Sequence, residues 1–205
     1  MHRSPAGEHV DDAGGYPERA AALARDVEAM RDALRRTLDT YDARRTALLD
    51  EVAACSDAVL TRRPAPERWS ILEITEHLAV SERDVLGGLP APDALVPARS
   101  PAFGRVRRWL LGCVLRSRLR VSVPSRTMMP TGARSLADVR ALWDENMAWL
   151  RSHIDHADER RLAEAVFSHP VSGPLTTAEV LVLADLHLTR HWKQIRQRHT
   201  ERDGA

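Results

Sequence analysis

Two histidines, His187 and His191, stand four residues apart in a segment near the end of the chain that has helical periodicity. On a helix this spacing places both imidazoles on one face about one turn apart, where both could reach a single ion. The spacing alone is a weak signal, because nine histidines in 205 residues give about a third of one chance pair. A metal site needs a third ligand and a buried setting.

The third ligand could be His77, the only histidine of another helical segment at 70–87. It shares a helical face with Ile74, Ser81 and Val85. A lone helical histidine is more often a hydrogen-bonded core residue, and from the residues alone that interpretation stays open. Buried imidazoles need partners, however, and one metal ion serves two that point the same way.

Four helical segments are predicted, at about 17–60, 70–87, 135–156 and 176–198, and strand signals are nearly absent. The first segment carries one apolar stripe from Leu23 to Val59 at steps of three, four and seven residues. As one helix it would be about 60 Å long. We therefore expect either a break near residues 39–42 or a first half that extends beyond the other helices.

The starts of the later helices are marked by capping residues. Ser70 with Glu73 and Thr176 with Glu179 form capping boxes, in which each side chain binds the other residue's free backbone N–H. Ser135 begins a partial version of the same pattern.

The connections define the fold class. A long segment, 87–134, carries six prolines and separates the second helix from the third, whereas residues 169–174 form a short loop before the fourth. This predicts an all-α four-helix bundle with a long crossover between the second and third helices. Residues 1–16 are expected to be a disordered tail, and 17–200 a single domain. The arginine-rich stretch at 105–120 is interpreted as a short solvated helix rather than a membrane or anion site.

Composition excludes several classes of function. The 30 basic and 29 acidic residues give a net charge of +1, so no nucleic-acid partner is expected. The longest apolar run, 109–115, is far shorter than the roughly 20 residues of a membrane span. Two distant cysteines without metal-ligand spacing fit a reduced thiol state. We therefore expect a cytoplasmic protein without a membrane partner; a homodimer remains open.

Three sequence stretches together resemble a known family. The stretch at 69–78, WSILEITEHL, resembles the WS-x-x-E-x-x-x-HL signature of the DinB-like (YfiT-like) four-helix-bundle metalloproteins. HPVSGPLT at 169–176 and HLTRHWKQI at 187–195 resemble that family's closing segments. The resemblance covers about residues 45–198 and implies that His77, His187 and His191 bind one divalent transition metal, with Zn or Ni expected first and Fe as a further option.

Three imidazoles without a fourth protein ligand leave an open position, which is typical of catalytic sites. Glu73 could orient His77 or serve only as a helix cap, and Ser81 and Gln194 are the other polar side chains expected near the ligands. Three functions remain. The resemblance implies transfer of a low-molecular-weight thiol to a small-molecule electrophile, as in detoxification; the alternatives are metal-dependent hydrolysis and a non-catalytic, stress-associated metal-binding module.

Overall fold

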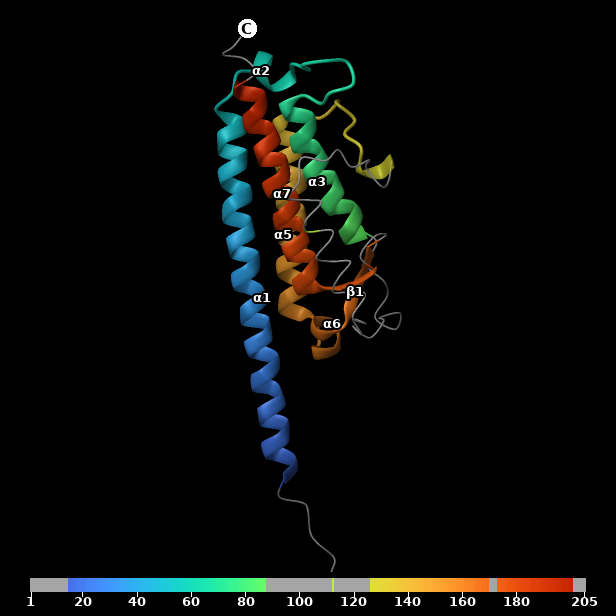
Figure 1. Cartoon of the computed structure of the whole chain (residues 1–205). Coiled ribbons are helices and arrows are strands. Elements are labelled where there is room, and N and C mark those ends of the chain that lie inside the picture. Colours follow the sequence, from blue (N-terminus) through green and yellow to red (C-terminus); the bar gives the residue numbers. More distant parts are fainter. Residues whose placement is uncertain (1–14, 88–111, 113–125, 170–172, 201–205) are drawn as a thin grey trace, which may run out of the picture.

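The computed structural model describes residues 15–87, 112, 126–169 and 173–200 (Figure 1). The expected tail up to residue 14, the crossover from 88 to 125 apart from residue 112, and with it all but one residue of the arginine-rich stretch therefore lie outside the described residues. Within them, no helix has the length and apolarity that a membrane crossing requires. The elements, in chain order, are α1 (Gly15–Ala53), α2 (Asp57–Thr61), α3 (Ile71–Gly87), η3 (Arg126–Met128), α5 (Leu136–His156), α6 (Glu159–Ala163), β1 (Ala165–His169), β2 (Gly173–Thr176) and α7 (Thr177–Thr200).

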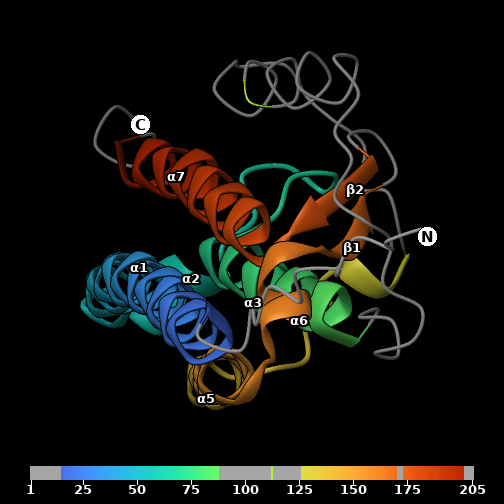
Figure 2. The same cartoon turned by 90° about the horizontal axis from the view of Figure 1, so that it is seen from below.

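The long helices form a four-helix bundle, as predicted. Seen along the bundle, α1 and α3 occupy opposite corners, and each packs against both α5 and α7 (Figure 2). α3 and α5 run in the same direction, as do α1 and α7 (Figure 1). The core fills the space between them, and its largest fully buried side chains include Trp143, Leu38, Leu48, Ile74, Leu181, Leu188 and Ile195. Burial of these apolar faces stabilises the helices, because isolated helices are marginal in water.

Helix α1 differs from the predicted segment 17–60. It continues unbroken through residues 39–42 and ends at Ala53, and α2 follows as a separate short helix. The acidic residues in the expected break, Asp39 and Asp42, form ion pairs with Arg151 instead of capping a new helix. Leu38 and Tyr41 are buried beside them. The core packing therefore keeps this part of α1 helical.

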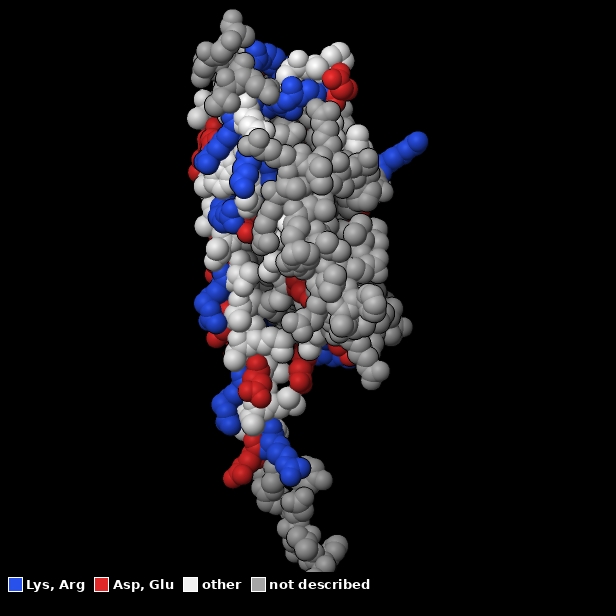
Figure 3. All heavy atoms as spheres, viewed as in Figure 1, with Lys and Arg blue, Asp and Glu red and all other residues white. Residues whose placement is uncertain are grey.

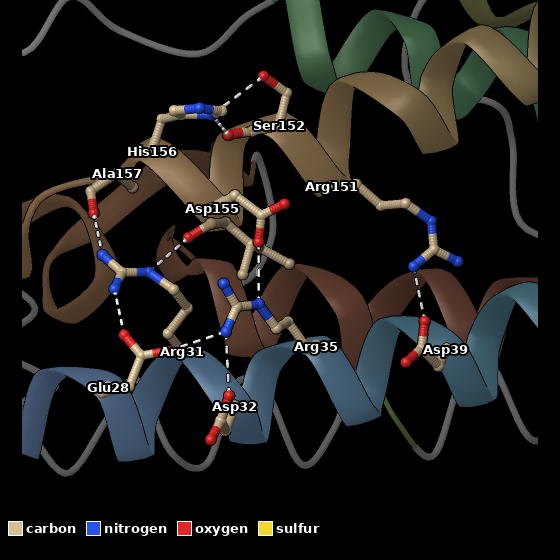
Figure 4. A network of polar contacts seen from close by, with 11 residues as sticks. Glu28, Arg31, Asp32, Arg35, Asp39, Arg151, Ser152, Asp155, His156 and Ala157 are labelled. Carbon is tan, nitrogen blue, oxygen red and sulfur yellow. Dashed lines mark hydrogen bonds and ion pairs between the residues drawn. The ribbon is translucent and has the colours of Figure 1, made fainter.

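The expected extension of α1 beyond the bundle is present (Figure 1). Arg31 donates hydrogen bonds to the carbonyl oxygens of Ile154 and Ala157, each at 3.1 Å, and so caps the C-terminal end of α5 (Figure 4). Arg35 adds an ion pair of 2.9 Å to Asp155. Residues 18–26 come before these contacts and are almost all exposed. Acidic and basic side chains both occur along this part of α1 (Figure 3), which fits a solvated helix.

The helix starts carry the hydrogen bonds of the capping boxes. Glu73 accepts from the backbone N–H of Ser70 at 2.9 Å, and Ser70 Oγ accepts from the N–H of Glu73 at 3.2 Å. Thr176 and Glu179 form the equivalent pair at the start of α7. At α5 the box is complete, with an aspartate as its second member.

A β-hairpin occupies the segment that was predicted to be a loop. Strands β1 and β2 pair antiparallel, with His169 opposite Gly173, and they lie beside the start of α7 (Figure 2). The expectation that strands are nearly absent is therefore wrong at this point. These strands have five and four residues, which is too short for period-two alternation to be distinguished from a loop.

Candidate metal centre

The three predicted histidines meet between α3 and α7. One ring nitrogen from each of His77, His187 and His191 lies within 4.8 Å of the others. Their ring centroids are 4.6–5.1 Å apart, and the rings are nearly perpendicular to one another. Two zinc–nitrogen bonds placed end to end span about 4 Å, so the three nitrogens are close enough for one transition-metal ion after small side-chain movements.

The α7 histidines lie next to its core-facing stripe. Leu181, Leu188 and Ile195 are fully buried at steps of seven residues, and the helical positions of both histidines lie on one side of this stripe. His191 is buried and His187 half-buried. From α3, His77 is buried as well, and the indole of Trp69 lies 4.8 Å from its ring centroid. The cluster is therefore inside the protein, and His187 is the one of the three residues that keeps some exposed surface.

Two of the imidazoles have hydrogen-bond partners at Nδ1. His77 Nδ1 lies 2.7 Å from the carbonyl oxygen of Met128, and His191 Nδ1 lies 2.8 Å from Gln194 Oε1. Both partners are acceptors, so each Nδ1 carries the proton and donates it. This assignment leaves Nε2 of both rings unprotonated, which is the form that binds a metal.

The surroundings keep the imidazoles neutral. Burial lowers the pKa of His77 below its ordinary value, against an opposing hydrogen bond to Met128. Burial, reinforced by repulsion from His77, lowers the pKa of His191 to about 3. Burial also lowers the pKa of His187 well below 6.5, and the neighbouring histidines and Arg190 add to the effect. At neutral pH all three rings are therefore unprotonated at one nitrogen.

The other predicted site residues fall into two groups. Gln194 contacts His191 as described, and Ser81 Oγ lies 3.1 Å from Nδ1 of His77. Glu73, in contrast, accepts hydrogen bonds from Ser70 and Arg63. Of the two roles considered for Glu73, the structure therefore supports the helix cap.

Two contacts at the site were missed by sequence reasoning. Met128 acts through its main-chain carbonyl, which no residue type signals. Trp69 packs against the core just before the start of α3, and it also covers the His77 ring. Its position eight residues before His77 in the WS-x-x-E-x-x-x-HL pattern was the available signal.

Comparisons with known proteins agree with this architecture. The sequence profile of the DinB superfamily matches residues 40–195. Among solved structures, the chain is similar to TT2238, described as a four-helix bundle protein, with a TM-score of 0.50 and 24% identity over 80% of this chain and 98% of that one. At this identity the likeness supports the fold alone. No curated protein matches. Because the profile covers well over half of its length, the chain belongs to the DinB superfamily.

Proposed function

We propose that this protein is a metal-dependent enzyme in which His77, His187 and His191 hold one divalent transition metal, Zn or Ni in the first place. The observation that carries the proposal is the gathering of three neutral imidazoles, with ring nitrogens within 4.8 Å of one another. Neutral nitrogen donors suit these ions. Hydrogen bonds at Nδ1 of His77 and His191 hold two of the rings in the orientation that binding needs.

The donor set favours catalysis over a purely structural metal. Structural zinc sites have four protein ligands, whereas catalytic sites have three and an open fourth position. In the described residues the cluster has three members. When bound, the ion would act as a Lewis acid toward a ligand in that position. The half-buried His187 indicates the side from which a small molecule would approach.

For the reaction we propose transfer of a low-molecular-weight thiol to an electrophilic small molecule. The thiol loses its proton to solvent, its sulfur forms a bond to the electrophilic carbon, and the leaving group departs with the bonding electrons. Three imidazole donors with an open fourth position suit an ion that would hold a thiolate there.

The test is a conjugation assay on metal-loaded protein with glutathione-like thiols and chlorodinitrobenzene as electrophile. Metal content is measured for wild type, His187→Ala and the control His156→Ala, whose imidazole is exposed and bound to the Ser152 carbonyl at the end of α5. We expect conjugation that disappears with chelator and in His187→Ala, and that persists in His156→Ala.

The other outcomes separate the alternatives. Cleavage of esters or amides without thiol would replace transfer with hydrolysis. Stoichiometric metal binding without turnover would indicate a non-catalytic metal-binding module. Protein that binds neither Zn nor Ni, or that binds them equally well in His187→Ala, would contradict the shared site itself.

A further inference from the structure

The residue next to His77 on α3 makes unusual contacts for a glutamate. Glu76 is completely buried, and its carboxylate accepts hydrogen bonds from the backbone N–H and hydroxyl of Thr131, at 3.0 and 2.7 Å, and from the N–H of Gly132 at 3.0 Å. Arg134 donates a further bond at 2.5 Å. All four donors belong to one segment, 131–134, which leads into α5. A buried carboxylate is costly unless its oxygens are bonded in this way.

Segment 131–134 follows closely after Met128, whose carbonyl oxygen lies 2.7 Å from Nδ1 of His77. Only two residues separate Met128 from Thr131, so Glu76 and His77 hold one short stretch of chain at two points. The fit against α3 is close. Gly132 has a φ of +70°, and a Cβ there would lie 3.1 Å from Glu73 Oε1. Both facts favour glycine at this position.

On the basis of the proposed metal centre, we propose that Glu76 is a positioning residue that selects the metal-binding tautomer of His77. By binding segment 131–134, Glu76 keeps the Met128 carbonyl opposite Nδ1 of His77. A carbonyl can only accept, so Nδ1 must carry the proton and Nε2 is left free for the ion.

A competing partner makes this selection necessary. Ser81 Oγ lies 3.1 Å from the same Nδ1, and a hydroxyl can donate as well as accept. If the Met128 carbonyl moves away, Ser81 can donate to Nδ1. The proton then sits on Nε2, and the ring presents N–H to the site. Glu76 acts on His77 through the loop, without touching the metal.

The experiment measures the tautomer directly in metal-free protein, by long-range ¹⁵N NMR of the His77 ring at neutral pH. Wild type should show the Nδ1–H form. Glu76→Gln weakens the hydrogen bonds to segment 131–134, because an amide has one acceptor oxygen and places its NH₂ against a donor. It should populate the Nε2–H form and reduce Zn affinity about 10- to 100-fold. Adding Ser81→Ala to Glu76→Gln removes the competing donor, so it should reverse part of the shift toward the Nε2–H form and part of the loss of affinity.

A matched control is Glu82→Gln, the same substitution on the same helix, since the Glu82 carboxylate faces Tyr41 and Trp143 rather than the loop. It should leave the His77 tautomer unchanged. If folded Glu76→Gln keeps the wild-type tautomer, or if Ser81→Ala does not reverse its effect, the positioning role is refuted.

A milder variant covers the case in which Glu76→Gln does not fold. Thr131→Ala removes one donor to Glu76 and should shift the His77 tautomer in the same direction by a smaller amount. An unchanged tautomer population would overturn the proposal. The tautomer is read without metal. A wild type that binds no metal would therefore refute the proposed function and leave this test standing.

Discussion

The buried histidines predict a loss of stability in acid for the metal-free protein, and His191 allows the effect to be estimated. Burial, with repulsion from His77, lowers its pKa to about 3 in the folded state, against about 6.5 in an unfolded chain. Between pH 3 and pH 6.5 the imidazole of His191 is protonated more readily in the unfolded chain than in the folded protein. The free energy of unfolding is therefore highest above pH 6.5 and falls as the pH decreases toward 3.

The size of the effect follows from these two pKa values. Each pH unit within the window costs about 1.4 kcal/mol per histidine. From pH 7.5 to pH 5, His191 should therefore remove about 2 kcal/mol from the free energy of unfolding. For a protein of this length, that corresponds to a decrease in Tm of roughly 4–8 °C. His77 and His187 have pKa values lowered in the same direction and add to the loss.

The assay is urea unfolding in the presence of a chelator at pH 7.5 and pH 5, for wild type, His191→Gln and the exposed control His156→Gln. Glutamine does not titrate, so His191→Gln should lose about 2 kcal/mol less than wild type between the two pH values. His156→Gln should follow wild type. The free energy of unfolding should fall with urea concentration at the same slope in all variants, so that their unfolding midpoints can be compared.

The result that would refute this reasoning is equal loss of stability in wild type and His191→Gln. The ring of His191 would then gain its proton in the folded state as easily as in the unfolded one. That would mean an imidazole open to solvent rather than one enclosed between α3 and α7.

Three further predictions concern stability and are measured by urea unfolding. Ser70→Ala and Thr176→Ala should each cost about 1 kcal/mol through the loss of a helix cap; unchanged midpoints would contradict the capping boxes. Arg31→Met should cost about 1 kcal/mol because the end of α5 loses two hydrogen bonds, and no loss would mean that water replaces them. Burial raises the pKa of Glu82, so wild type should lose stability relative to Glu82→Gln as the pH rises above 4.5; parallel pH profiles would argue against this.

The long helices and the histidine cluster could be predicted because each depends on a pattern within one helix. The i, i+4 spacing alone put His187 and His191 on one face of α7, and the capping boxes marked where α3 and α7 begin. The contact between His77 and the pair links residues more than a hundred positions apart. The residues alone proposed His77 as the third member and left a hydrogen-bonded core histidine open, and the resemblance to a family then favoured the shared site.

The sequence left two alternatives for the first helix, and contacts with another helix decide between them. At residues 39–42 the short acidic side chains are suited to capping, but tertiary ion pairs with Arg151 use Asp39 and Asp42 instead, and the helix continues. The true end of α1 lies at Ala53, beyond which Ser56 occupies the N-cap position of α2 without a side-chain cap bond. Local propensity is a weak guide wherever such partners from another helix decide the outcome.

The polar residues of α3 explain why the support of the site was out of reach of sequence patterns. Periodicity assigns polar residues to the solvent face, so the burial of Glu76 and Glu82 was not expected, whereas Ser81, which is also buried, was expected near the site because it shares a helical face with His77. Each has partners supplied by other parts of the chain or by His77 itself. A helix surrounded by protein has no solvent face, so its polar residues must satisfy one another or the loops that cover them. Buried positions that break the hydrophobic pattern are therefore the places where a structural support for a site can be sought.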